Sequence, residues 1–405
     1  MKVFYDDRYV GAAHSFDTTR KAELVAEAAA GMPGVELCSP QEATQRELAM
    51  IHDPAYVRAV LTGVGPRKSS AGFSWDEGYA KAVATSTGGA VEAALAALRD
   101  GVAGSLSSGL HHAGPESGSG FCTFNGLALA AKIALGGRPT DGFFRRLVKP
   151  RCKRVLILDL DAHCGGGTFH IIKDDPRIYQ IDISVCHFDS YRGCDPDRHH
   201  LHVVSDPEDY LPLLELELER AAEIGFDLVL YNSGMDPHED CNIGGLPGIT
   251  SDVIRLRERM VFDWARARGI PVAFVLAGGY TGGDMWDERL TALHQMTVAA
   301  ATQGKMPDIG KIEANRPKPV YVAEVVTDDD TDRLNHDFWE DINREAEREL
   351  AEDLGLYAEP WDGYGDGDFQ GETGVKEYKS IHELPQEFFE IGNEDLRAQY
   401  PEFFE

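Results

Sequence analysis

The chain has 405 residues, 43% of them hydrophobic, which suits one large α/β enzyme domain with a sizeable core. No apolar run approaches the roughly 20 residues of a membrane-spanning helix, and the N-terminus lacks the apolar segment of a secretory signal. The seven cysteines are scattered, with no C-x-x-C pair. This pattern argues against a zinc knuckle or a disulfide framework, and it favours a cytoplasmic location without membrane attachment.

The charge is unevenly distributed along the chain. The formal net charge is -29, and residues 321–405 alone hold 26 acidic and 6 basic side chains. A chain this acidic lacks the basic surface that phosphate binding requires. We therefore expect no nucleic-acid partner. We predict a folded domain over residues 1–310 and an acidic extension over residues 311–405, partly helical or disordered. The extension is expected to be solubilising; the alternatives are that it attracts cationic substrates or covers another surface of the protein.

Predicted strands and helices alternate over most of the first 305 residues. The first part of the chain predicts a strand and then helices, at residues 1–6, 15–31, 39–51, 54–65, 77–101 and 125–137. Apolar strands follow at 155–158, 178–185, 226–236 and 271–280. The helices between and after them lie at 209–225, 251–269 and 288–303, and a last one at 336–355. This order predicts a three-layer α/β/α fold with a mainly parallel central sheet.

The stretch VLILDLDAHCGGGT, residues 155–168, combines a buried strand with polar residues at alternate positions. Its first four residues are apolar on both faces, as in a parallel sheet. Asp159, Asp161 and His163 lie two residues apart and share one face while the chain stays extended. Buried carboxylates need partners such as a metal or a histidine. The glycines that follow allow a sharp turn and a close approach to the backbone.

Three strand ends carry polar groups, and open α/β sheets bind their ligands at this edge. Asp161, His163 and Asp236 supply one nitrogen and two carboxylate oxygens and leave a fourth position open, as a catalytic zinc site requires. Such a metal lowers the pKa of its water and polarises a carbonyl. Each aspartate taken alone could equally cap a helix or turn. Their combination with His163 favours the metal.

A glycine-rich loop carries the adjacent residues His111 and His112, and Tyr280 stands between two glycine pairs. Because histidine titrates near neutral pH, one of the pair could remove a proton from the metal's water. The Tyr280 hydroxyl could stabilise the oxyanion that forms at a substrate carbonyl. The structural alternatives are a surface or core histidine pair and a packed aromatic ring.

Four motifs in this order, GLHHAG with GFCTFN, DLDAHCGGGT, NSGMD and LAGGY, resemble the zinc-dependent histone deacetylase and acetylpolyamine amidohydrolase family. The segment MIHDPAYVRAV is also similar to an early helix of that family. The resemblance is collinear over roughly residues 1 to 305. It implies the arginase/deacetylase fold and makes the 1–310 region a deacetylase-like catalytic domain. The acidic extension has no counterpart in the resemblance.

The resemblance implies one catalytic zinc ion bound by Asp161, His163 and Asp236. It implies a catalytic role for His111, His112, Tyr280 and Asp159, the last as the buried partner of His111. A structural K⁺ or Na⁺ is implied near Asp159, His163 and Ser184. Substrate contacts are implied for Gly120 and Phe121, which would line the acyl channel, and for Gly278 and Gly279. The wall of the channel opposite Gly120 and Phe121 is implied to be Phe188 or Tyr191.

Three departures from the family pattern concern the site. Gly166 stands where the family has an Asn or Asp that orients the second histidine, so His112 is left without its usual partner. Cys164 replaces a histidine, and Ser-Ser-Gly-Leu precedes the histidine pair in place of Arg-Pro-Pro-Gly. Another side chain or a water would have to substitute at His112.

We therefore predict a zinc-dependent amidohydrolase that removes an acetyl or related acyl group from an acetylpolyamine, an acetyl-lysine or a small-molecule amide. The first alternative is a non-catalytic zinc-containing protein that binds acyl amines, suggested by Gly166. A binuclear manganese ureohydrolase is less favoured, because Gly165 occupies the position of an additional aspartate. The family's small-molecule members are often dimers, so a homodimer is a candidate assembly.

Overall fold

Eight strands form one sheet in the part of the chain that the structure describes. The computed structural model describes residues 1–12, 17–65, 67–68, 71, 73–139 and 152–316. The strands are β1 (Lys2–Phe4), β2 (Glu36–Cys38), β3 (Val102–Ser105), β4 (Val155–Asp159), β5 (Ile178–Ser184), β6 (His199–Val203), β7 (Leu228–Ser233) and β8 (Val272–Leu276). Their order across the sheet is β2-β1-β3-β8-β7-β4-β5-β6, and all neighbouring pairs are parallel.

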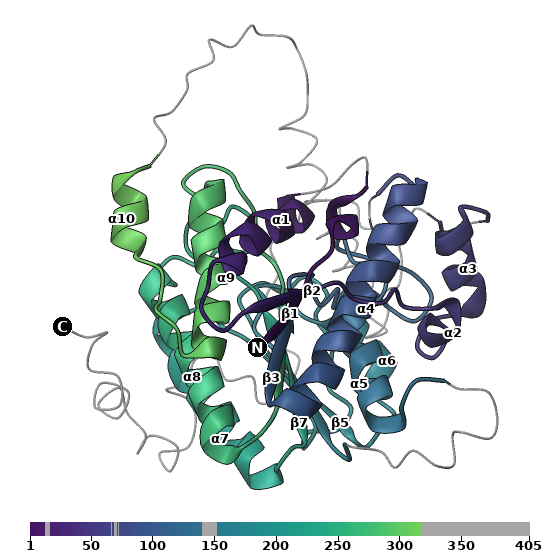
Figure 1. The fold of residues 1–405 in the computed structure, drawn as a ribbon. Coiled ribbons are helices and arrows are strands. Elements are labelled where there is room, and N and C mark those ends of the chain that lie inside the picture. The colour runs from purple at the N-terminus through teal and green to yellow at the C-terminus, as the bar shows by residue number, and fades with distance from the viewer. Residues whose placement is uncertain (13–16, 66, 69–70, 72, 140–151, 317–405) are drawn as a thin grey trace, which may run out of the picture. The chain divides into compact units, whose positions relative to one another are not determined.

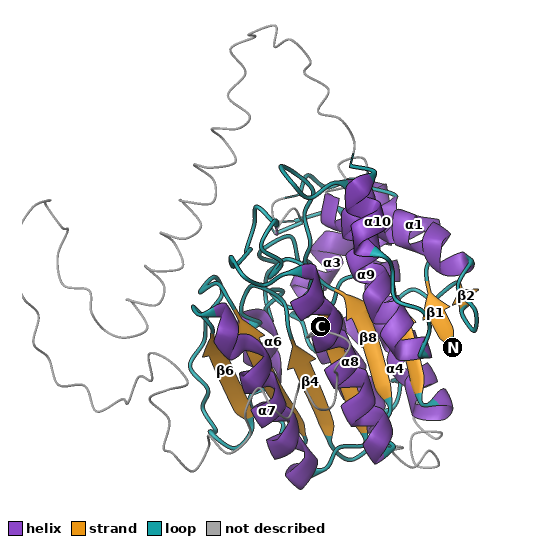
Figure 2. Cartoon of the chain, turned by 90° about the vertical axis from the view of Figure 1, so that its left-hand side faces the viewer, coloured by secondary structure: helices purple, strands orange, loops and turns teal. Residues whose placement is uncertain are grey.

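Helices cover both faces of this sheet (Figures 1 and 2). The α-helices are α1 (Asp17–Ala30), α2 (Gln45–Leu48), α3 (Pro54–Thr62), α4 (Glu77–Asp100), α5 (Gly126–Gly136), α6 (Gly166–Ile172), α7 (Tyr210–Ile224), α8 (Ser251–Arg268), α9 (Asp287–Thr302) and α10 (Ile309–Ala314). Two short 3₁₀ helices are η1 (Asp7–Val10) and η4 (Pro207–Asp209). The predicted three-layer fold with a parallel sheet is confirmed.

The alternating side chains of β4 show how the two layers of core are built. Leu156 and Leu158 pack into the core under α1, α7, α8 and α9, whereas Val155 and Ile157 pack into the core under α3, α4 and α5. All four side chains are fully buried. A central parallel strand must be apolar on both faces because helices cover both. For this reason the run of apolar residues at 155–158 indicates a central strand of a parallel sheet.

Three of the strands were not predicted, and each lacks the usual strand signal. β2 has only three residues, none of them buried, at one edge of the sheet. β3 has the sequence VAGS, where small residues replace the β-branched and aromatic residues typical of strands. β6 has the sequence HHLHV at the opposite edge. The short helix α6, which begins in a glycine run, was also missed.

The small residues of α4 permit unusually close packing. A Cβ atom at Gly88 would overlap the backbone of Gln41, and one at Gly89 would overlap the side chains of Tyr9 and Ser105. Helix α4 packs against α5, η1, β3 and β8. Only a helix with glycine at these two positions can approach its neighbours so closely.

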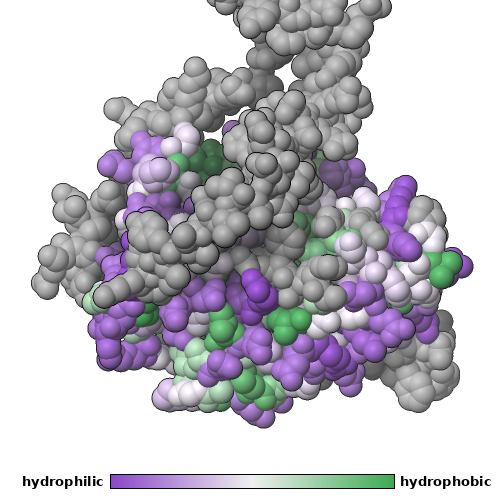
Figure 3. Space-filling view, turned by 90° about the horizontal axis from the view of Figure 1, so that it is seen from above, coloured by the Kyte–Doolittle hydropathy of each residue, from purple (hydrophilic) through white to green (hydrophobic). Residues whose placement is uncertain are grey.

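The described surface offers few large hydrophobic side chains. Leu37, Met50 and Val64 are the large hydrophobic residues that are exposed. Seen from above, the described residues present mostly hydrophilic side chains, with hydrophobic ones in small scattered groups (Figure 3). None of the helices in the described ranges is both long and apolar enough to cross a bilayer. The predicted acidic extension lies, from residue 317 onward, outside the described residues, as does the helix predicted at 336–355.

A fully buried arginine on α8 connects the two strand ends that matter most for the site. Arg257 donates hydrogen bonds to the carbonyl of Leu160 (3.2 Å) and to that of Gly234 (2.7 Å). It also pairs with the buried carboxylate of Glu258 at 2.7 Å. Because Leu160 follows β4 and Gly234 follows β7, this guanidinium fixes the backbone of both segments beyond the sheet.

Replacing Arg257 by leucine should destabilise the fold strongly. Glu258 would remain buried without its counter-ion, a situation that costs about 3–5 kcal/mol. Urea denaturation should show this loss in the free energy of unfolding. The matched control is Arg266→Leu on the same helix, whose ion pair with Asp263 is exposed and should contribute less than about 1 kcal/mol. Equal stability of the two variants would contradict the role given to Arg257.

Candidate metal centre

Asp161, His163 and Asp236 meet beyond the carboxyl ends of β4 and β7. These two strands are neighbours, with Asp159 paired opposite Asn232. The Nδ1 atom of His163 lies 3.2 Å from Asp161 Oδ1 and 3.2 Å from Asp236 Oδ2. The structure therefore brings together the three predicted ligands from two separate strand ends.

The second oxygen of each carboxylate is held by the backbone. Gly278 N–H donates to Asp161 Oδ2 at 2.7 Å, and Ala162 N–H donates to Asp236 Oδ1 at 3.1 Å. A Cβ atom at Gly278 would overlap the carboxylate of Asp236. Glycine is thus required at Gly278 so that the backbone after β8 can reach both carboxylates. The remaining oxygens are directed toward His163.

The donor set fits a divalent cation. The three residues are at most 4% exposed. Burial and the neighbouring charge of Asp161 raise the pKa of Asp236 to about 6, which reflects the cost of placing two carboxylates together without a cation. Zinc bonds of 2.0–2.2 Å in tetrahedral geometry separate neighbouring ligand atoms by about 3.3–3.5 Å. The observed spacings of 3.2 Å are close to this value.

His111 and His112 lie beside the three candidate ligands, with their ring centroids 3.9 Å apart. His111 Nδ1 lies 2.8 Å from Asp159 Oδ2, and its Nε2 lies 3.6 Å from Asp161 Oδ1. Asp159 is fully buried and accepts a further hydrogen bond from Asn232 at 2.8 Å. The predicted pairing of Asp159 with His111 is thus present in the geometry.

A residue that sequence reasoning missed, Asp189, provides the partner of His112. Asp189 Oδ2 lies 2.8 Å from His112 Nδ1 and also accepts a hydrogen bond from Gly167 N–H at 3.0 Å. The backbone of Asp189 has a φ of 57°, in the left-handed region that is uncommon for residues other than glycine. A Cβ atom at Gly166 would overlap Asp189. Gly166 is therefore the space into which the Asp189 carboxylate fits.

The pKa values of the two histidines are shifted in opposite directions because their surroundings differ. Burial alone would lower the pKa of His111, but the charges of Asp159 and Asp161 outweigh it and raise the pKa to about 10. Burial, together with the charges of His111 and His163, holds the pKa of His112 well below its usual range. At neutral pH His111 is then an imidazolium, whereas His112 is a neutral ring that can accept a proton.

Tyr280 lines the same small cavity as both histidines and Asp161. The cavity has a volume of about 30 Å³, and Gly120, Phe121, Cys122 and Gly278 also line it. Burial and the charges of Asp236 and Asp161 raise the pKa of Tyr280 well above 10, so its hydroxyl stays protonated and able to donate. A space of this size accommodates roughly one or two water molecules.

Of the predicted channel residues, Gly120 and Phe188 lie beside His112, whereas Tyr191 and Gly279 do not line the small cavity. Gly120 has a φ of 49°, and a Cβ atom there would overlap the ring of His112 and contact Phe188. Phe188 also lies edge-on against His112, at 4.9 Å between ring centroids, so of the two candidates for the opposite wall it is the one beside the site. Tyr191 instead stacks on Phe169 at 4.4 Å, away from the cavity lining. Gly279 faces Leu290 and His294 rather than this cavity.

The region predicted to hold a monovalent cation contains one more carboxylate than expected. Ser184 Oγ donates to Asp182 Oδ1 at 2.5 Å, and Asp182 Oδ2 accepts from Gly165 N–H at 2.7 Å. Burial and the charge of Asp159 raise the pKa of Asp182 well above its usual range. The monovalent cation near Asp159, His163 and Ser184 stays a prediction.

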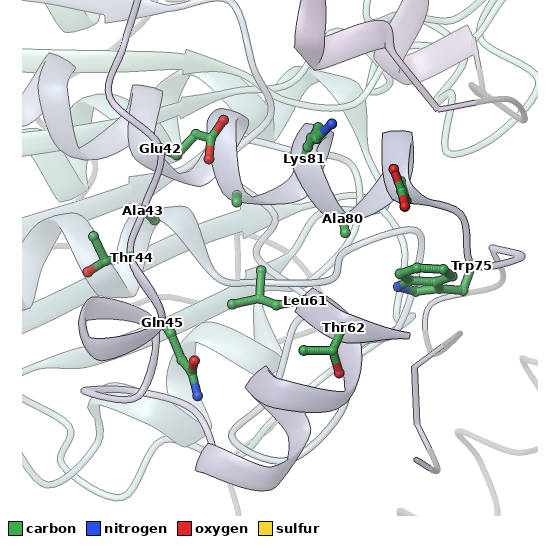
Figure 4. Close-up of a pocket in the computed structure, with 11 residues that line it drawn as sticks. Glu42, Ala43, Thr44, Gln45, Leu61, Thr62, Trp75, Ala80 and Lys81 are labelled. Atoms are coloured by element: carbon green, nitrogen blue, oxygen red, sulfur yellow. The ribbon is translucent and has the colours of Figure 1, made fainter. Parts of the chain in front are cut away.

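A larger cavity, of about 460 Å³, lies elsewhere, between α2, α3 and α4 (Figure 4). Glu42, Trp75 and Lys81 are among its lining residues. It shares no lining residue with the small cavity at Asp161, and its lining contains neither histidine nor cysteine. Its size therefore does not make it the site of the chemistry.

Comparison with known proteins shows the family of this chain. A sequence profile of the histone deacetylase domain matches residues 14–296. The chain belongs to the histone deacetylase domain family. An uncharacterised protein of Picosynechococcus is 33% identical over 251 residues, covering 60% of this chain and 79% of that protein. Histone deacetylase 2 of Arabidopsis thaliana is 31% identical over 258 residues, covering 60% of this chain but only 63% of that protein.

Two solved structures share the fold of this deacetylase-family chain. One is an acetylpolyamine aminohydrolase from Burkholderia pseudomallei, with a TM-score of 0.57 and 18% identity, covering 74% of this chain and 98% of that one. The other is the HD domain of HDA15, with a TM-score of 0.59 and 21% identity, covering 75% and 91%. Both support the arginase/deacetylase fold predicted from the motifs.

Lys21 is a further buried group of this deacetylase-family site that sequence reasoning missed. Its ammonium, on α1, donates to the carbonyl of Ala277. Burial lowers its pKa to about 8, although the charges of Asp236 and Asp161 oppose this shift. Lys21 adds positive charge near two candidate ligands. No local sequence signal marks it, since a lysine on an amphipathic helix is normally exposed.

The relation between Gly166 and Asp189 can be tested by exchanging the two residues. Gly166→Asp places a side chain on top of Asp189, so it should lower the free energy of unfolding by about 1–3 kcal/mol. Adding Asp189→Gly removes the side-chain part of the overlap but leaves the carbonyl oxygen of residue 189, which the added Cβ also overlaps. The double variant should therefore recover part of the loss, a non-additivity of about 0.5–3 kcal/mol. Denaturant titration measures both.

The control for this exchange is Gly136→Asp, where an added side chain meets no atom within 4 Å. It should change stability by less than about 1 kcal/mol. Strictly additive effects of Gly166→Asp and Asp189→Gly would show that the two residues do not share one space.

Proposed function

We propose that this chain is a zinc-dependent amidohydrolase that removes an acetyl or similarly small acyl group from an amine. The observation that carries the proposal is one small buried cavity lined by Asp161, Tyr280 and a histidine pair, each histidine with an aspartate at its Nδ1. A neutral base, a protonated hydroxyl and a metal-binding carboxylate are the groups that amide hydrolysis needs at one place.

Asp161, His163 and Asp236 would hold the zinc ion. When bound, the ion supplies Lewis acidity to a water molecule and to the amide carbonyl. Two carboxylates and one imidazole leave a coordination position open, as in other catalytic zinc sites. Their hydrogen bonds from Gly278 and Ala162 fix the carboxylate orientation before an ion arrives, which is the function of such outer contacts around a metal.

Proton transfer falls to His112 in this proposal. With its Nδ1–H donated to Asp189, the Nε2 atom of the neutral ring is left with a lone pair that can take a proton from the attacking water. The same atom can then deliver that proton to the amine nitrogen as the C–N bond breaks. His111 stays protonated between Asp159 and Asp161 and contributes positive charge rather than a proton acceptor.

Tyr280 is the proposed donor to the oxyanion. Its raised pKa keeps the hydroxyl protonated while negative charge develops on the former carbonyl oxygen. A donor aimed at that charge is worth most in a site from which water is excluded. The cavity of about 30 Å³ supports such a site and supports a small acyl group.

The amine half of the substrate is proposed to be cationic or to carry a cationic neighbour. The net charge of -29 favours attraction of polyamines and lysine side chains over anionic amides. The relatives named histone deacetylase and the fold relative named acetylpolyamine aminohydrolase are consistent with both. An acetylpolyamine and an acetyl-lysine peptide are therefore the two substrates to compare first.

The two alternatives have less support. The non-catalytic alternative was suggested by Gly166, and Asp189 removes that motive by supplying a partner to His112. A binuclear manganese site would need further carboxylates beside the first ion. Of the two possible metal-binding groups among the described residues, the one that holds Asp161 has three members, Asp161, His163 and Asp236, and the other shares no residue with it. Neither alternative explains why a protonated tyrosine and a neutral histidine line the cavity.

The direct test is a deacylation assay on acetylpolyamine and acetyl-lysine substrates. Tyr280→Phe should lower kcat by about 10²–10³ with little change in KM, because its donor acts mainly in the transition state. Chelation should abolish turnover, and added zinc should restore it. Tyr179→Phe, which removes a tyrosine hydroxyl on β5 outside the small cavity lining, is the matched control for general damage. Full activity of the Tyr280→Phe enzyme would remove the proposed oxyanion role.

The pH dependence should report on Asp189. Burial raises the pKa of Asp189 to about 7, so its carboxylate is lost as pH falls through 7, and His112 then loses its charged partner. We expect kcat/KM to rise with pH between about 6 and 8. Asp189→Asn should lower activity about 10–100-fold and flatten this rise, because the amide cannot titrate.

The control for the pH profile is Asp197→Asn, an exposed residue of the same loop. It should retain the profile of the unmodified protein. An Asp189→Asn enzyme with an unchanged acidic limb would assign that limb to another group.

A further inference from the structure

We propose that His200, His202 and Glu217 form a second metal site, which binds a divalent transition ion of the zinc class and has a structural role. The site lies at the edge of the sheet and shares no residue with the cluster of Asp161, His163 and Asp236. It does not depend on the proposed deacylase activity. We call these three residues the β6–α7 cluster.

The strand and the helix place the three side chains together. His200 and His202 are two residues apart on β6 and so share one face of the strand. Glu217 on α7 lies against that face, with Oε2 2.6 Å from His200 Nδ1 and Oε1 3.0 Å from His202 Nε2. All three ligand atoms lie within 4.8 Å of one another. Two imidazole nitrogens and one carboxylate oxygen form a zinc ligand set.

The outer contacts of His200 prepare it for metal binding. Its Nε2 lies 2.8 Å from the carbonyl oxygen of Pro196, to which it donates. Histidines that bind metals usually donate their other ring N–H to a carbonyl or carboxylate, which fixes the ring and the ligating nitrogen. The Pro196 carbonyl therefore directs Nδ1 of His200 toward Glu217. Without an ion, a proton must occupy the short space between these two atoms.

The negative charge of the Glu217 carboxylate is compensated by its neighbours His200 and His202. It is fully buried, and burial alone would raise its pKa, but the hydrogen bonds and charges of His200 and His202 outweigh burial and keep it ionised. Arg220 donates to Oε1 at 2.7 Å and can hold that oxygen while Oε2 binds the ion. An ion that displaces the imidazole protons would keep the charge of Glu217 balanced.

The cluster is open to solvent on one side, which gives an ion a way in. The side chains of His200 and His202 are 16% and 30% exposed. Water can complete the coordination from that side. The ion would tie β6, which is an edge strand among the described strands, to α7. Through Pro196 it would also hold the segment between β5 and β6, which carries Asp189.

The experiment counts zinc per chain in the full-length protein after removal of metal and dialysis against zinc. The unmodified protein should hold two ions. His202→Gln should hold one ion and keep its deacylase activity, with zinc affinity at the second site reduced more than about tenfold. Asp236→Asn should hold one ion and lose activity. The matched control is His170→Gln, an exposed histidine outside the cluster, which should still hold two.

A second measurement leaves the β6–α7 cluster intact. The Asp236→Asn protein, loaded with one equivalent of Cu²⁺, should give an electron paramagnetic resonance spectrum with coupling to two imidazole nitrogens. A further His202→Gln change should remove one of them. Two zinc ions retained by His202→Gln, or a single ion that is lost with Asp236→Asn, would overturn the second site. The latter result would leave the proposed deacylase site standing.

Discussion

Buried negative charge at the carboxyl ends of β4 and β7 is the constraint on which the structure of the site depends. Asp159, Asp161 and Asp236 are at most 3% exposed, and an ionised carboxylate cannot stay in such a place without donors. The chain supplies them from several directions: Asn232 and His111 to Asp159, Gly278 to Asp161, and Ala162 to Asp236. The oxygens left over converge on His163. A cation at that point would balance this negative charge, which is the physical reason for the metal site that we propose there.

The same requirement explains the exchange between Gly166 and Asp189. What His112 needs is a carboxylate at its Nδ1, and the direction from which it comes is secondary. In this chain the carboxylate comes from the loop after β5, and the loss of a side chain at Gly166 provides its space. The left-handed backbone of Asp189 is consistent with a residue held in place for its side chain. A departure from the family motif can therefore preserve its chemistry when a second residue compensates in space.

The sequence predicted what is encoded locally. The buried strands β4, β7 and β8 begin with apolar runs, and the polar residues at their ends were recognisable as candidate ligands because parallel strands present their carboxyl ends on one edge. Contacts between distant segments were not predictable. Asp189 and His112 are 77 positions apart, and Lys21 and Ala277 are 256 apart. No spacing rule connects such pairs. Phe188 and Tyr191 also could not be separated by sequence, since only the path of one loop places Phe188 beside His112.

The strand β6, which was not predicted, combines a local sequence pattern with a contact between distant segments. Its histidines are the reason that it does not read as a strand, because hydrophobic alternation is the usual signal. Yet they alternate with Leu201, and this period of two is what places His200 and His202 on one face against Glu217. An edge strand buries little apolar area, so β6 depends on polar contacts with α7 for its position. Ion pairs stabilise such contacts weakly, whereas a bound metal ion stabilises them strongly. The loop that carries Asp189 ends in this strand, but His112 and Gly167 hold the Asp189 carboxylate at the site itself, so the edge can change without loss of that contact.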